Sequence, residues 1–151
     1  MAGVLSETTD PETIATIDKY QHWIYTHPGH SNEERETEWK AILKEFSTGQ
    51  VDWNGFDEYR ANLWQKQLHL FEVPFYYIEY GIAQLGAIAM WRQYRQNKEQ
   101  ALDNYMAALS RGYTKTLKEL YETAGIKFDL SPAYVKELAD FVQPIITEMA
   151  N

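Results

Sequence analysis

Residues 74–91 read PFYYIEYGIAQLGAIAMW, which is the most apolar stretch of the 151-residue chain. Apolar residues recur at helical spacing on two sides of it, one formed by Phe75, Ile78, Ile82, Leu85 and Ala89 and the other by Tyr76, Tyr80, Ala83 and Ala87. A helix that is apolar nearly all round is a buried helix. Gly81 and Gly86 each cost about 1 kcal/mol against alanine inside a helix, so they indicate close packing or an adjacent site. The stretch therefore predicts a buried helix.

Helix signals continue on both sides of this stretch, and no alternating strand pattern is longer than a few residues. Caps at Asp10, Ser31 and Ser131, together with breaks at Pro28 and Pro74, set the boundaries. The expected helices cover about residues 11–26, 31–46, 56–70, 74–91, 98–109 and 114–124, and a last helix starts at 131 and kinks at Pro144. Short connections join them, so the sequence predicts a single compact all-α domain of about seven helices.

The composition excludes several classes of function. Fourteen basic residues against 22 acidic ones give a formal net charge of −8, which makes the chain a poor ligand for nucleic-acid phosphates. The absence of cysteine excludes disulfides, thiolate metal sites and a cysteine nucleophile. No apolar run reaches the roughly 18 residues of a membrane span, and the chain does not open on a signal-peptide pattern. We therefore expect a cytoplasmic protein that binds neither nucleic acid nor membrane.

The strongest candidate for a functional site lies in residues 69–80, HLFEVPFYYIEY, which hold one histidine, two glutamates and three tyrosines. Tyr76 and Tyr80 are four residues apart, which predicts rings one turn apart on a single helix face. Two stacked phenols in an apolar wall can clamp a developing oxyanion or a peptide carbonyl. The alternative is that buried tyrosines only bond neighbouring polar groups, and the residues alone favour it. Glu79, if buried in this helix, would need a salt bridge.

A second candidate is the histidine group His22, His27 and His30 near the end of the first helix. Three imidazoles can bind zinc or nickel, but their spacing matches no standard closed site, so a solvated helix end is favoured. The remaining histidine is His69, and none of the four is followed directly by glutamate. The H-E-x-x-H motif of metallopeptidases is therefore absent, as are the phosphate-binding glycine loops and G-x-S-x-G.

Three blocks, in this order, resemble the C-terminal portion of oligoendopeptidase F, a member of the zinc oligopeptidase family that includes thimet oligopeptidase. They are IDKYQHWIYTHPGHSNEER at 17–35, QLHLFEVPFYYIEYGIAQLGA at 67–87 and LYETAGIKFDLS at 120–131. The resemblance covers about residues 13–148. It implies that residues 13–151 form the C-terminal helical part of such a catalytic domain, and that residues 1–12 are a divergent or disordered N-terminal segment.

The resemblance also implies roles for individual residues. In this family the two histidines of H-E-x-x-H and a further glutamate hold zinc, and all of them lie upstream of the region present here. The present region supplies a histidine and tyrosines that bind the substrate backbone and stabilise the tetrahedral intermediate. Carried over, Tyr80 is the catalytic oxyanion donor, and His69 and Tyr76 support catalysis and substrate binding. Tyr77 is the competing choice for one of the tyrosine roles.

The function implied is that of a truncated C-terminal segment of a cytoplasmic zinc metallopeptidase that hydrolyses short peptides. Zinc would belong to the full-length enzyme, with none bound to this chain. An oxyanion donor contributes roughly 3–4 kcal/mol and does not replace the metal, so the chain alone is expected to be inactive. The expected partners are short peptide substrates, and the missing N-terminal part of the peptidase or a second copy of the chain. The alternative is a stand-alone, metal-less helical module that binds a peptide or another protein.

Overall fold

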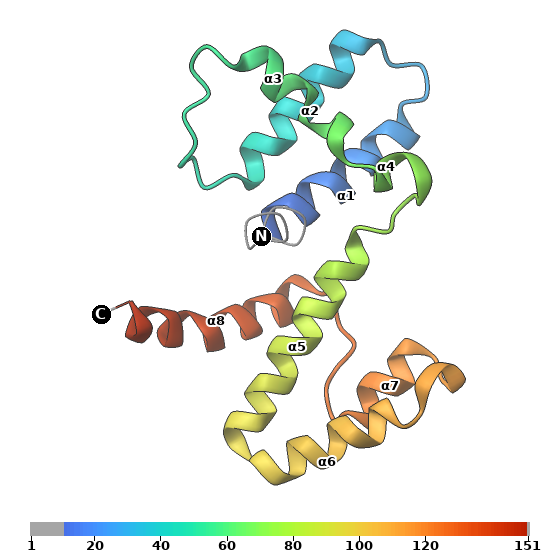
Figure 1. The fold of residues 1–151 in the computed structure, drawn as a ribbon, viewed down its shortest axis with the longest axis vertical. Coiled ribbons are helices and arrows are strands. Elements are labelled where there is room, and N and C mark those ends of the chain that lie inside the picture. The colour runs from blue at the N-terminus through green and yellow to red at the C-terminus, as the bar shows by residue number, and fades with distance from the viewer. Residues whose placement is uncertain (1–10, 151) are drawn as a thin grey trace. The chain divides into compact units, whose positions relative to one another are not determined.

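A computed structural model describes residues 11–150, and every regular element in that range is helical (Figure 1). The α-helices are α1 (Pro11–Thr26), α2 (Asn32–Phe46), α3 (Asp57–Asn62), α4 (His69–Glu72), α5 (Ile78–Gln96), α6 (Lys98–Leu109), α7 (Leu117–Thr123) and α8 (Pro132–Met149), and the 3₁₀ helices are η1 (Leu63–Lys66) and η2 (Gly112–Thr114). The predicted all-α class is confirmed. The cap predicted at Asp10 and residues 1–10 of the expected N-terminal segment lie outside the described residues.

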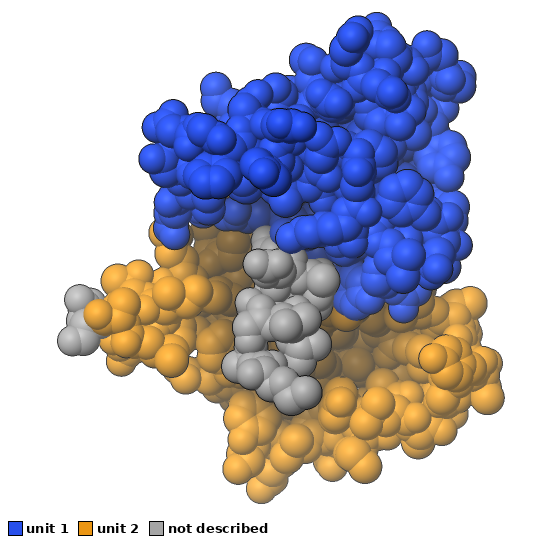
Figure 2. Space-filling view, turned by 45° about the horizontal axis from the view of Figure 1, so that its top comes forward, with its two compact units in different colours: residues 1–81 blue, residues 82–151 orange. Residues whose placement is uncertain are grey.

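The chain divides into two compact units, residues 1–81 and residues 82–151, where the short connections predicted a single compact domain (Figure 2). The boundary falls inside α5, so this helix is the covalent connection between the two units. Among the described helices, none combines the length and the apolar character that crossing a bilayer requires.

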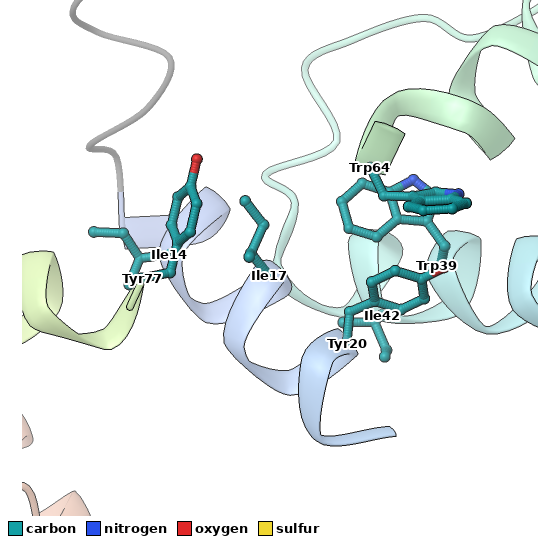
Figure 3. Close-up of a cluster of buried hydrophobic side chains, with 7 residues drawn as sticks. All are labelled: Ile14, Ile17, Tyr20, Trp39, Ile42, Trp64 and Tyr77. Atoms are coloured by element: carbon teal, nitrogen blue, oxygen red, sulfur yellow. The ribbon is translucent and has the colours of Figure 1, made fainter. Parts of the chain in front are cut away.

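The first unit is organised around aromatic and branched side chains from α1, α2 and η1 (Figure 3). Its core residues are Ile14, Ile17, Tyr20, Trp39, Ile42, Trp64 and Tyr77. Tyr20 meets Trp39 edge-on with ring centroids 5.0 Å apart, and the Trp39 indole N–H donates to the Arg60 carbonyl at 2.9 Å. The first three core residues follow helical spacing on α1, so one face of this helix carries the core of the unit.

The second unit has a smaller core, formed by Ala89, Tyr134 and Leu138. Gly86 is buried beside it, where an added Cβ would lie 2.9 Å from the Tyr121 ring carbon that carries the hydroxyl. That hydroxyl donates to the Ile82 carbonyl at 2.9 Å. The close packing predicted at Gly86 is confirmed, and its neighbour is the Tyr121 side chain.

Helix α5 differs from the prediction in its start and in its burial. It begins at Ile78 rather than near Pro74, because residues 74–77 form a turn. Only Gly86 and Ala89 are buried within it. The expectation of a helix buried on all sides is therefore wrong. Within the described part of the chain, most apolar side chains of α5 are not fully buried.

Two capping boxes fix helix starts, one at α2 and one at α7. The Ser31 hydroxyl accepts from the Glu34 N–H at 3.2 Å, and the Ser31 N–H donates to the Glu34 carboxylate at 2.7 Å. Thr116 and Glu119 repeat the arrangement, with N–H to carboxylate at 2.9 Å. These hydrogen bonds lower the pKa of Glu34 and of Glu119, because they stabilise the charged form.

Acid should therefore weaken the fold through these two glutamates. Because each folded pKa lies below the ordinary value of 4.5, their stabilisation is complete above that value and is lost as pH falls through the folded values. Thermal melts followed by circular dichroism from about pH 6 to about pH 3 should show a shallower loss of Tm in the double variant Glu34→Gln/Glu119→Gln. Glu33→Gln, at a neighbouring first-turn acid outside the box, is the control. An unchanged pH slope in the double variant would contradict this assignment.

Candidate functional site

The four residues singled out from the sequence come together in the first unit. His69 opens α4, Tyr76 and Tyr77 lie in the turn between α4 and α5, and Tyr80 lies in the first turn of α5. Their side chains come from twelve consecutive residues, so the local path of the chain keeps them near one another.

His69 is at the centre of the group. Its ring stacks on Tyr76, with centroids 5.4 Å apart and planes 12° apart. Tyr77 and Tyr80 meet it edge-on at 5.2 Å and 6.1 Å, and the Tyr80 hydroxyl lies 3.4 Å from His69 Nε2. Tyr76 and Tyr80 are 5.6 Å apart at 84°, so the predicted stacking of these two phenols is wrong although they are neighbours.

Burial separates the three tyrosines into different roles. Tyr77 is 2% exposed, and its hydroxyl donates to Gln67 Oε1 at 2.5 Å. Its proton is therefore already engaged within the protein. Tyr76 is 44% exposed, while His69 and Tyr80 are half-buried. A ligand can reach Tyr76 from solvent, and Tyr80 lies next to it.

A tight turn, rather than a helix, brings Tyr76 to this position. The Tyr76 N–H donates to the Val73 carbonyl at 3.2 Å, with Pro74 and Phe75 between them. Phe75 has a φ of 60°, in the left-handed region. Proline followed by a residue of positive φ is the pattern of a type II turn, whose third position usually holds glycine or asparagine. Tyr76 thus precedes α5, and the prediction that it shares a helix face with Tyr80 is wrong.

Two buried glutamines that the sequence analysis missed hold this turn. Gln21, 2% exposed on α1, accepts a hydrogen bond from the Phe75 N–H at 2.8 Å, and Gln67 accepts from Tyr77. With Thr16, they are the buried polar side chains of the described residues. The signal in the sequence was a glutamine among the apolar residues of α1, next to Tyr20, but its partner lies 54 residues away.

Two glutamates lie in the same stretch of sequence, residues 69–80. Glu72 and Glu79 are exposed, so the buried salt bridge considered for Glu79 is not needed.

The histidine group near the end of α1 makes contacts within the protein. His27 stacks on Trp23 with centroids 5.0 Å apart, and His30 Nε2 accepts from the Arg35 side chain at 2.8 Å. The His22 Nδ1 lies 2.9 Å from the Asp18 carbonyl oxygen. Over residues 11–150, no group of three or more His, Cys, Asp or Glu side chains is arranged to hold a metal ion. The structure therefore gives no support to a metal site at these histidines.

Comparisons with known proteins match most of the chain. The family model described as Peptidase family M3 matches residues 13–140. The fold is similar to that of a solved structure of PZ peptidase A with inhibitor 2, with a TM-score of 0.81 and 27% identity over 91% of this chain. It is also similar to an oligoendopeptidase F, with a TM-score of 0.75 and 24% identity over 90% of this chain. The match spans 24% of the length of each of these two proteins. A comparison with curated proteins gave no match.

Proposed function

The chain belongs to peptidase family M3, and from that premise we propose that it is the C-terminal, substrate-facing segment of a zinc metallo-oligopeptidase catalytic domain. The resemblance to this family seen in the sequence is thereby confirmed. The observation that carries the proposal is the arrangement of an exposed and a half-buried tyrosine around one histidine. The described residues offer no cluster of metal donors, so zinc would be held outside them.

In this proposal Tyr80 is the catalytic residue. Its phenol donates a hydrogen bond to the oxygen that becomes negative as the peptide carbonyl turns tetrahedral. In the tautomer that carries its proton on Nε2, His69 donates to the Tyr80 hydroxyl oxygen 3.4 Å away. The phenol proton is then left for the substrate, and the phenol becomes a stronger donor. Tyr76 binds the peptide backbone, since its ring is the most exposed of the group. Tyr77 supports the site from the core through Gln67.

The proposal assigns binding and transition-state stabilisation to this chain, and nucleophile activation to the remainder of the peptidase. The chain alone is then inactive towards short peptides, and its partner is the zinc-bearing portion of the same enzyme. The lack of cysteine is compatible with the reducing cytoplasm, where we place this activity.

A stand-alone interaction module is the second candidate function. Large apolar side chains exposed on the second unit favour it, among them Met106, Leu109 and Tyr113. Such side chains on a domain that works alone usually serve a partner or a second copy. A stable dimer that binds peptides without hydrolysing them would support this candidate.

The first experiment compares the isolated chain with the native gene product, sized on a blot with an antibody against the chain. We expect the chain with added zinc to leave quenched fluorescent peptides intact, while peptide addition shifts the NMR signals of Tyr76 and Tyr80. A longer native product should hydrolyse the same peptides and lose activity with a chelator. A native product of the chain's own size that binds no peptide would overturn the proposal.

A further inference from the structure

The turn that precedes α5 is held by one face of α1. The Phe75 N–H donates to the Gln21 side-chain oxygen at 2.8 Å. The Phe75 ring meets His22 edge-on with centroids 4.7 Å apart, and it lies 5.2 Å from Tyr25. These contacts come from consecutive turns of α1 and reach the same residue, which ties the backbone between His69 and Tyr80 to a rigid element.

The conformation held in this way is one that phenylalanine does not adopt readily. Phe75 is the only non-glycine residue with a positive φ in the part of the chain that the structure describes. L-residues avoid this region because the Cβ crowds the backbone carbonyl. Such a conformation persists when the surroundings fix it. Of the contacts that α1 makes with Phe75, the hydrogen bond that Gln21 accepts from the Phe75 N–H acts on the backbone itself.

The side-chain oxygen of Gln21 accepts the hydrogen bond from the Phe75 N–H. Gln21 is 2% exposed, and its side-chain nitrogen has no hydrogen-bond partner among the described residues. A buried amide that uses only its oxygen is costly compared with an apolar side chain of the same size. The bond to the Phe75 N–H is thus what the glutamine provides that a methionine would not.

We propose that Gln21 is a positioning residue, whose side-chain oxygen fixes the turn at Phe75 and thereby sets Tyr76 and Tyr80 around His69. Without this acceptor the turn relaxes to the common form, in which both central residues have negative φ. The peptide plane before Phe75 then rotates, and Tyr76 leaves its stacked position on His69. The inference rests on the proposed function only for its catalytic consequence, since the positioning itself is a property of this chain.

Amide exchange and ring signals of the labelled 151-residue chain test the proposal. Gln21→Met keeps the volume and removes the acceptor. We expect hydrogen exchange at the Phe75 amide to accelerate about tenfold or more, and the His69 ring signals to shift, because the turn loses its anchor. Adding Phe75→Gly should return the His69 signals towards those of the unmodified chain, since glycine takes a positive φ without help.

Matched variants separate positioning from general destabilisation. Thr16→Val, at a buried site on the same helix, should leave the Phe75 amide and the His69 ring unchanged. Gln21→Asn withdraws the oxygen by one methylene. It should change the Phe75 exchange rate and the His69 ring signals in the same direction as Gln21→Met, and it replaces Gln21→Met as the test if that variant does not fold. Unchanged Phe75 exchange in the folded variants, or no recovery with Phe75→Gly, would overturn the proposal.

A kinetic readout adds the catalytic consequence. In a longer native product with peptidase activity, Gln21→Met should lower kcat/KM about tenfold, and the second change to Phe75→Gly should recover most of it. If the product shows no peptidase activity in any form, the proposed function fails. The exchange and ring signals still decide the role of Gln21 in that case.

Discussion

Tyr80→Phe should lower kcat for peptide hydrolysis by about 10²–10³-fold in the longer zinc peptidase that we propose, with little change in KM. The substitution keeps the ring, and with it the edge-on contacts to His69, Tyr76 and Tyr77. It removes only the hydroxyl that lies 3.4 Å from His69 Nε2. A hydrogen bond made mainly to the developing oxyanion stabilises the transition state more than the bound peptide. Its loss therefore affects kcat and kcat/KM equally.

Steady-state kinetics on one fluorogenic peptide distinguish this role from peptide binding. Tyr76→Phe should change both kcat and KM, because the exposed Tyr76 is assigned to the peptide backbone. Tyr113→Phe, at a fully exposed tyrosine in η2, is the control for loss of a phenol and should change neither. If Tyr80→Phe raises KM and leaves kcat unchanged, the oxyanion role belongs to another residue.

The sequence predicted the fold best where helix boundaries depend on neighbouring residues. The capping box at Ser31 and the break at Pro28 delimit α1 and α2 as expected. The single helix expected over residues 56–70 was wrong, because α3 gives way to the 3₁₀ helix η1 and then to α4. Trp64 of this region is buried in the core against Tyr20 of α1, and such tertiary contacts outweigh local helix propensity.

The sequence predicted which residues form the candidate site, but not the backbone conformation that brings them together. His69, Tyr76 and Tyr80 are neighbours as expected. Helical spacing does not explain the position of Tyr76, because this residue lies in the turn before α5. Proline marked the break correctly, but no local pattern predicts a phenylalanine with positive φ. That conformation depends on Gln21, which lies 54 residues earlier in the chain.

Trp39→Ala should lower the free energy of unfolding by about 3–5 kcal/mol, a large fraction of the stability of a domain this size. Trp39 is 3% exposed, packs edge-on against Tyr20 and donates its indole N–H to the Arg60 carbonyl. Alanine leaves a cavity between α1 and α2 and removes the donor to that carbonyl. Urea unfolding followed by far-ultraviolet circular dichroism measures the loss without relying on tryptophan emission.

Tyr20→Phe is the matched control in the same core. The Tyr20 hydroxyl is buried without a hydrogen-bond partner among residues 11–150, and burial raises its pKa. Removing it should leave stability unchanged or slightly higher, since the ring contacts remain. Tyr77 and Trp39 belong to the same core, and the Tyr77 ring contacts His69. Trp39→Ala should therefore also loosen the packing against His69, and the ring signals of His69 should broaden. A loss below about 1 kcal/mol for Trp39→Ala, or an equal loss for Tyr20→Phe, would contradict this account of the core.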